Sequence, residues 1–271
     1  MGPVIYTIVI TLVLLILIFL FLILPYKPGK KLTVPFYGKN FAHRGLYEKD
    51  QSIPENSLPA FDRACLHGYG MELDVQLSRD GEVVVFHDDG LKRMCGIDKQ
   101  VDELDYEELK KLSLHGTDER IPLFTEVLAT VNGRTPMIVE LKSGRRNDEL
   151  CLKTLRLLEK YNGDYCVESF DPAIVAWFRF HAPHIMRGQL AQQPGVYKMP
   201  FIKRTIVGCT LMNFAARPNF IAYRIGKKPF PVKIAEALGA VKVAWTSHSE
   251  ETEKDFDVVI FEHYLPKVKY K

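Results

Sequence analysis

Three acidic side chains lie inside strand-like runs of this sequence, where hydrophobic residues are expected. Glu72 and Asp74 lie in MELDVQL (71–77), and Glu140 lies in MIVELK (137–142). Because strand side chains alternate between two faces, the acids share one face and the apolar residues take the other. Carboxylates that share a face repel each other and are costly to desolvate unless a cation lies between them. Without cysteine or paired-histidine spacing nearby, Glu72, Asp74 and Glu140 predict a site for a hard cation, Mg²⁺ or Ca²⁺.

Two histidines stand close to these acids in the predicted topology. His43 and His87 each end a strand-like run, beside Arg44 and Asp88. One neutral and one protonated imidazole can serve as general base and general acid near neutral pH. The alternative is an internal ion-pair network, in which Arg44 and Lys142 only neutralise the acids. The histidine pair favours catalysis, with either histidine as the base.

Strand-like runs alternate with helical patterns from residue 40 to about 265, which indicates a parallel sheet. About eight strands in this length predict a (β/α)₈ TIM barrel, with its active site at the carboxyl ends of the strands. Residues 78–120 break the rhythm and are interpreted as a small insertion after the second strand. Nine strand-like runs are candidates for these strands, at 41–45, 71–77, 137–142, 165–170, 185–190, 205–211, 219–223, 241–246 and 256–261. The predicted helices begin near 56, 148, 172 and 231.

The first 25 residues predict one transmembrane helix. Residues 4–24 form 21 uncharged residues, long enough to cross a bilayer core of roughly 30 Å. A cleaved signal peptide is the alternative, but a basic start and a small-residue cleavage site are both missing. Residues 26–39 are interpreted as a linker. Lysines follow the helix and none precedes it, which places the barrel in the cytoplasm, and five scattered cysteines suit a reducing compartment. A net charge of +3, without any nucleic-acid-binding motif, gives no indication of nucleic acid.

Four separated blocks of this sequence resemble the glycerophosphodiester phosphodiesterases, in the same order and spacing. They are HRG (43–45), PENSLPAF (54–61), ELDVQLSRDGEVVVFHD (72–88) and VELK (139–142). With the N-terminal helix, they suggest a membrane-anchored bacterial type. The resemblance implies a (β/α)₈ barrel that hydrolyses glycerophosphodiesters with a divalent cation, releasing glycerol 3-phosphate and an alcohol. It implies His43 and His87 as the acid–base pair, Glu72, Asp74 and Glu140 as metal ligands, and Arg44, Glu55, Lys142 and Trp245 as substrate-binding or supporting residues.

The last third of the chain departs from the family pattern. WTSH (245–248) stands where the family usually has Trp-Thr-x-Asn, and VIFEHY (259–264) replaces an acid-Pro ending. Substrate choice therefore stays open. Two other classes are weighed: a phospholipase C or sphingomyelinase D-like barrel phosphodiesterase, and a catalytically silent membrane scaffold that binds a lipid headgroup. No protein partner is indicated.

A membrane anchor suggests a substrate at the bilayer, such as a lysophospholipid. The segment 192–204, QQPGVYKMPFIKR, mixes aromatic and aliphatic residues with Lys and Arg. This mixture suits a loop at a membrane interface, and the segment is expected at the barrel mouth. The alternative is an ordinary connecting loop whose apolar residues pack on the barrel.

Overall fold

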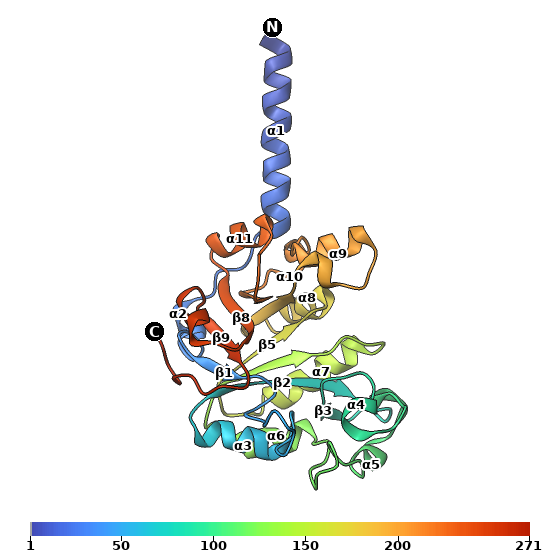
Figure 1. The fold of residues 1–271 in the computed structure, drawn as a ribbon. Helices are drawn as coiled ribbons and strands as arrows, with labels where there is room; N and C mark the ends of the chain where they lie inside the picture. The colour runs from blue at the N-terminus through green and yellow to red at the C-terminus, as the bar shows by residue number, and fades with distance from the viewer. Residues whose placement is uncertain (1) are drawn as a thin grey trace.

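The computed structural model describes residues 2–271 and contains a closed barrel of eight parallel strands (Figure 1). Met1, the first residue of the predicted anchor, lies outside the described residues. Hydrogen bonds join the strands in the order β1-β9-β8-β7-β6-β5-β4-β2, and pairing of β1 with β2 closes the ring. The predicted (β/α)₈ barrel is confirmed. Its strands are β1 (Asn40–Ala42), β2 (Gly70–Leu77), β4 (Met137–Leu141), β5 (Tyr165–Ser169), β6 (Arg187–Ala191), β7 (Phe220–Arg224), β8 (Val241–Ser247) and β9 (Val258–Phe261).

The strands separate two kinds of side chain. The odd-numbered residues of β2, among them Met71 and Leu73, pack outward against helices. Even-numbered residues therefore point into the ring. A second buried cluster, which includes Ile138 and Phe220, fills the interior. A Cβ atom at Gly188 of β6 would collide with the Phe220 ring, so glycine makes room for this aromatic side chain.

Helices that connect the strands surround the barrel. Ser57 caps the first connecting helix by accepting a hydrogen bond from Ala60 N, close to the predicted start near residue 56. The strand predicted at 205–211 is wrong, because these residues continue helix α9 and the turn after it. A short apolar run fits either structure by periodicity alone. These helices are α3 (Leu58–Leu66), α6 (Phe124–Val131), α7 (Asn147–Leu158), α8 (Pro172–His181), α9 (Phe201–Gly208), α10 (Asn213–Ala216) and α11 (Phe230–Ala237).

The segment between β2 and β4 forms a small lobe beside the barrel mouth (Figure 1). Its strand β3 (Val83–Val85) pairs antiparallel with the end of β2. Three short helical turns follow, and their apolar side chains form a separate buried cluster. The lobe therefore has a core of its own. The turns are α4 (Lys92–Cys95), η1 (Val101–Glu103) and α5 (Tyr106–Leu109).

Helix α1 (Gly2–Ile23) projects from the barrel as a nearly fully exposed rod (Figure 1). It is long and apolar enough to cross a membrane, and a signal sequence would pass the same test. A single turn, α2 (Lys30–Thr33), precedes β1. The remaining short elements are η2 (Pro194–Val196), before α9, and η3 (Glu250–Lys254), between β8 and β9.

Candidate active site

The three acids of the predicted cation site meet inside the barrel. Glu72 and Asp74 project from β2, and Glu140 projects from the neighbouring β4, where it is in register with Asp74. One carboxylate oxygen from each lies within 4.8 Å of the others, and all three side chains are buried. Burial, and then the neighbouring carboxylates, raise the pKa of Glu72 well above its usual value. A bound cation would relieve this repulsion, so the donor set fits a metal ion.

Two basic side chains partly compensate the acids. Lys142 Nζ lies 2.9 Å from Glu140 and 3.4 Å from Asp74. Arg44 Nη1 donates to Glu55 over 2.7 Å, while its Nε lies 3.7 Å from Asp74. Burial opposes ionisation of Asp74, but His87, Lys142 and Arg44 together hold its pKa far below the usual range. The predicted substrate-binding residues Arg44, Glu55 and Lys142 therefore lie together at the acid cluster.

Both predicted catalytic histidines are paired with a carboxylate through Nδ1. His43 Nδ1 lies 2.8 Å from Glu262, and its Nε2 lies 4.0 Å from Glu72. His87 Nδ1 lies 2.6 Å from the carboxylate of Asp88. A carboxylate at Nδ1 holds the proton on that nitrogen, which leaves Nε2 as the reactive position in a neutral imidazole.

Three residues at this site were missed by the sequence analysis. Glu168 of β5 is buried beside Glu140, in register, and its Oε2 has no hydrogen-bond partner among residues 2–271. In YCVESF, Glu168 alternates with apolar residues as Glu140 does in its own strand, and this pattern could have revealed it. Glu262 directly follows β9 and also accepts from Tyr47 over 2.9 Å. Arg93, in α4, bonds both Glu55 and Asp88, and no local pattern marks it.

The divergent WTSH segment lies at the end of β8. Trp245 Nε1 donates to Ala222 O, and its ring meets the Phe170 ring edge-on at 5.4 Å between centroids. Its role as a substrate-binding residue stays a prediction. Ser247 is buried, and its hydroxyl bonds Ser249 O and Thr252. Exposed His248 lies 3.5 Å from Glu262.

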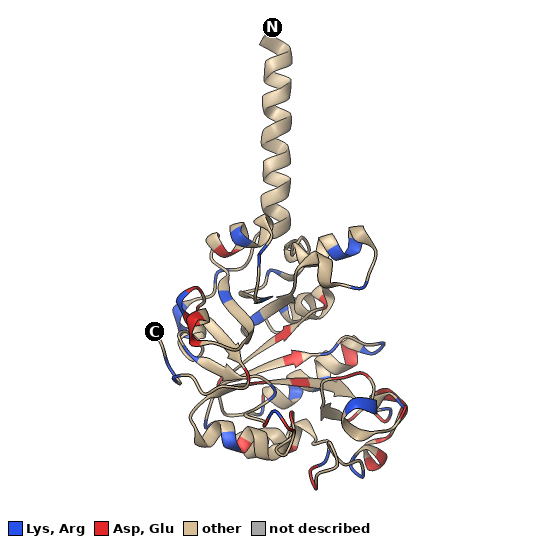
Figure 2. Cartoon of the chain, in the orientation of Figure 1, with Lys and Arg blue, Asp and Glu red and all other residues tan. Residues whose placement is uncertain are grey.

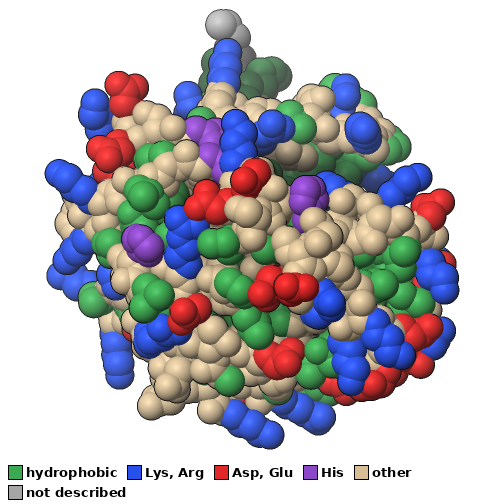
Figure 3. All heavy atoms as spheres, turned by 60° about the horizontal axis from the view of Figure 1, so that its bottom comes forward, with side chains coloured by type: hydrophobic (Ala, Val, Ile, Leu, Met, Phe, Trp, Pro, Cys, Tyr) green, Lys and Arg blue, Asp and Glu red, His purple; other side chains and the backbone are tan. Residues whose placement is uncertain are grey.

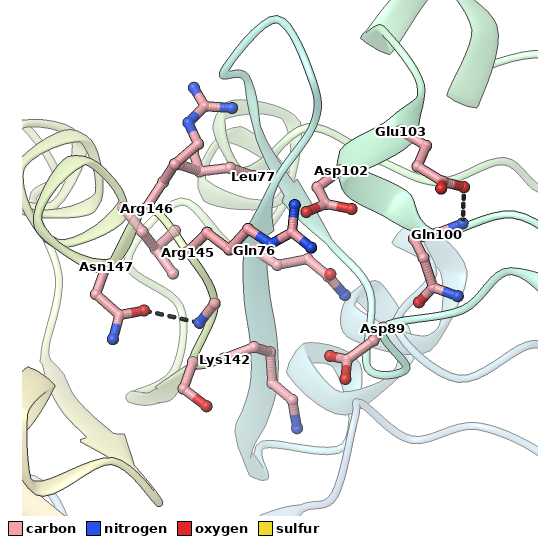
Figure 4. Close-up of a pocket in the computed structure, with 13 residues that line it drawn as sticks. Gln76, Leu77, Asp89, Gln100, Asp102, Glu103, Lys142, Arg145, Arg146 and Asn147 are labelled. Carbon is pink, nitrogen blue, oxygen red and sulfur yellow. Dashed lines mark hydrogen bonds between the residues drawn. The ribbon is translucent and has the colours of Figure 1, made fainter.

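A cavity of about 430 Å³ lies between the small lobe and the loop after β4 (Figure 4). Lys142, which contacts the acid cluster, forms part of its wall. Asp89 and Asp102 line it from the lobe, while Arg145 and Arg146 line it from the loop. The cavity therefore extends the site toward a polar, open space.

A TIM barrel with carboxylates, imidazoles and cationic side chains at its strand ends holds the groups that cleavage of a phosphate ester would need. Comparison with known proteins narrows the class. Residues 43–260 match the model of the glycerophosphoryl diester phosphodiesterase family, and the chain belongs to this family. The resemblance drawn from the four sequence blocks is thereby confirmed.

Relatives and solved structures agree with this assignment. A glycerophosphodiester phosphodiesterase of Caldanaerobacter subterraneus is 33% identical over 56% of this chain and 65% of its own length. Human lysophospholipase D GDPD1 is 32% identical over 48% of this chain and 44% of its own. A phosphodiesterase from Oleispira antarctica, solved with the product sn-glycerol-3-phosphate, shares the fold with a TM-score of 0.68, at 22% identity over 83% of this chain and 93% of its own. The alignments thus span about two thirds of the bacterial relative and under half of the human one.

Proposed function

We propose that this protein hydrolyses glycerophosphodiesters with the help of Mg²⁺ or Ca²⁺, releasing glycerol 3-phosphate and an alcohol. The observation that carries the proposal is the convergence of three buried carboxylates, at Glu72, Asp74 and Glu140, with a histidine close to them. A divalent cation at these ligands would neutralise a phosphodiester and stabilise charge on its non-bridging oxygens. The name of the Caldanaerobacter relative and the glycerol 3-phosphate bound to the Oleispira structure support this substrate class.

In the proposed reaction, the basic side chains bind the substrate and the histidines transfer protons. Arg44 and Lys142 bind the phosphate oxygens that approach the acid cluster. One of the histidines, His43 or His87, accepts a proton from the attacking hydroxyl as its oxygen bonds to phosphorus. The other donates a proton to the alcohol oxygen as the ester P–O bond breaks. The attacking oxygen belongs to water, or to the substrate's own glycerol hydroxyl in a path through a cyclic phosphate.

We further propose that α1 spans the membrane and holds the barrel on the cytoplasmic side. Its exposed apolar length and the lysines that follow it support this placement. A tethered barrel could act on lysophospholipids, and human lysophospholipase D GDPD1 is similar to part of this chain. In this scheme, residues 40–265 form the catalytic barrel, with the lobe at 78–120 inserted, and residues 26–39 link it to the anchor.

The test is product analysis with the full chain in detergent. With glycerophosphocholine and Mg²⁺ or Ca²⁺, we expect glycerol 3-phosphate and choline, detected by phosphorus NMR and choline oxidation. A chelator should abolish the reaction. Glu72→Gln or Asp74→Asn should do so without lowering the unfolding temperature, whereas the exposed control Glu107→Gln should keep full activity.

The rival classes give different outcomes. Choline phosphate as the product would indicate phospholipase C-type cleavage. Headgroup binding without turnover would indicate a silent scaffold. Faster cleavage of lysophosphatidylcholine in vesicles than of glycerophosphocholine in solution would support the lipid substrate, and the opposite preference would leave α1 as a tether.

A further inference from the structure

The base of α1 is fixed to the barrel by specific contacts. Ile23 is fully buried in a cluster with side chains of β7 and α11. Asn213 donates to Ile23 O over 3.0 Å, and Arg217 donates to Leu24 O over 2.7 Å. Farther up the helix, Phe19 stacks on Phe230 of α11 with ring centroids 6.4 Å apart. Carbonyl groups at the end of α1 are thus satisfied by barrel side chains rather than by water.

These contacts fix the orientation of the barrel relative to α1. A flexible tether would let any face of the barrel approach the bilayer, whereas a docked helix presents one face only. That side of the barrel carries α10 and α11, which contact α1, and α9, which lies near the base of α1 (Figure 1). If α1 spans the membrane, as the proposed function states, α9 and α11 lie beside the headgroups.

The composition of this face matches a bilayer surface. Phe201 and Ile202 open α9 with 69% and 72% of their surfaces exposed, and Phe230 opens α11 with 67% exposed. Large apolar side chains exposed to this degree mark interaction sites when they gather on one surface. At an interface, aromatic and aliphatic side chains enter the headgroup region, so a bilayer would cover them.

The part of the chain that forms this face carries mainly positive charge. Residues 192–239 contain eight Lys and Arg but a single acid, Glu236, which pairs with Lys228. Lys and Arg positions lie on α9 and α11 near α1 (Figure 2), whereas the face turned away from the helix carries both basic and acidic side chains (Figure 3). A basic surface next to an anchor complements anionic lipid headgroups.

We propose that the α9–α11 face, here residues 192–204 and 225–233, is a second membrane contact that takes anionic headgroups. Residues 192–204 follow β6 and residues 225–233 follow β7, at the carboxyl ends of the strands. The acid cluster opens at the same ends, so this contact places one rim of the mouth at the bilayer surface. A lysophospholipid headgroup could then reach the site while its acyl chain stays in the bilayer.

The test uses environment-sensitive labels on the full chain in liposomes. In a Cys95→Ser, Cys209→Ser background, an NBD label is placed at Phe201→Cys, with Leu12→Cys in α1 as the positive control. Leu66→Cys, exposed at the end of α3, is the negative control. Quenching by spin-labelled phospholipid measures contact with the bilayer. With phosphatidylserine present, quenching at residue 201 should approach that at residue 12 and exceed that at residue 66.

Two matched pairs of substitutions test whether the positive charge of the face contributes to membrane contact. Lys203→Gln with Arg204→Gln should weaken quenching at residue 201, and so should pure phosphatidylcholine. Lys110→Gln with Lys111→Gln, in the lobe, should leave it unchanged. Quenching at residue 201 no greater than at residue 66, while residue 12 is quenched, would overturn the proposal, and contact with a protein partner would then explain the face. Hydrolysis of soluble glycerophosphocholine by the same samples tests the proposed function separately.

Discussion

Each histidine of the site is oriented by a carboxylate. For one histidine this carboxylate is a sequence neighbour, and for the other it comes from a distant part of the chain. Asp88 is the neighbour of His87 in the sequence, whereas Glu262, just after the last barrel strand, lies far from His43 in the sequence. Burial raises the pKa of Glu262, but its bonds with His43 and Tyr47 bring the value down to about 2. Glu262 is therefore ionised at working pH and positions the His43 imidazole through Nδ1.

Replacing Glu262 by Gln should move the pH profile of the enzyme. Burial lowers the pKa of His43, and Glu262 opposes this shift by stabilising the imidazolium. A neutral amide cannot do so, hence the pKa of His43 falls further. The limb of kcat/KM that reports His43 should move to lower pH whether His43 is base or acid. The rate should fall about tenfold or more, as when an imidazole loses its orienting carboxylate.

A matched substitution separates this effect from a general loss of structure. Glu48→Gln removes a different carboxylate, in the connection between β1 and α3. Glu48 is half-exposed and pairs with Arg63. The substitution should leave both limbs of the profile in place. A Glu262→Gln enzyme with reduced rate but an unshifted profile would show that Glu262 supports the fold rather than the imidazole.

At the scale of elements, strand register assembles the acid cluster. Asp74, Glu140 and Glu168 lie opposite one another on β2, β4 and β5. A slip of one residue in either pairing would turn a carboxylate out of the barrel into the helical layer. The two-residue period of the sequence was enough to predict the first two acids. The same two-residue period also applies to Glu168, which is the single acid of its strand.

Contacts between elements distant in sequence could not be predicted in this way. Arg93 meets Glu55 only after β3 folds back on β2 and positions the lobe at the mouth. Similarly, Glu262 meets His43 only when β9 pairs with β1 and completes the ring. Such contacts depend on how elements distant in sequence pack together, whereas alternation within a strand is a local property.

Arg93 should connect the lobe to catalysis. It bonds Glu55 with Nη2 over 2.6 Å and Asp88 with Nε over 2.6 Å, so it links the first connection of the barrel to the carboxylate that holds His87. Arg93→Ala should free Asp88 and loosen His87, with a fall in kcat of about tenfold or more. Turnover assays at saturating substrate, with circular dichroism melts, measure both effects.

An arginine elsewhere in the lobe provides the control. Arg79 forms exposed ion pairs with Asp105 and Glu108, and surface pairs of this kind contribute little to stability because solvent screens them. Arg79→Ala should therefore keep normal turnover. Equal losses of turnover in the two variants would mean that the lobe acts through its stability and not through the Arg93 contacts.

At the scale of the whole molecule, α1 and the barrel behave as one unit. The helix covers part of the outer surface of β7, where Ile23 packs against Ile221 and Tyr223. Its last backbone carbonyls accept hydrogen bonds from Asn213 and Arg217. The sequence predicted the anchor by its length and lack of charge, but not this docking, because the contacting polar residues lie about 190 positions away.

If α1 spans the membrane, as proposed, the orientation of this unit gives the last prediction. Lys27, Lys30 and Lys31 follow α1, and the positive-inside bias predicts that they and the barrel lie in the cytoplasm. In the Cys95→Ser, Cys209→Ser background, Leu66→Cys should resist an impermeant maleimide in intact cells and react after permeabilisation. Gly2→Cys, at the other end of α1, should react in intact cells. Labelling of residue 66 in intact cells would place the barrel outside, where its substrate would have to come from the outer leaflet or the medium.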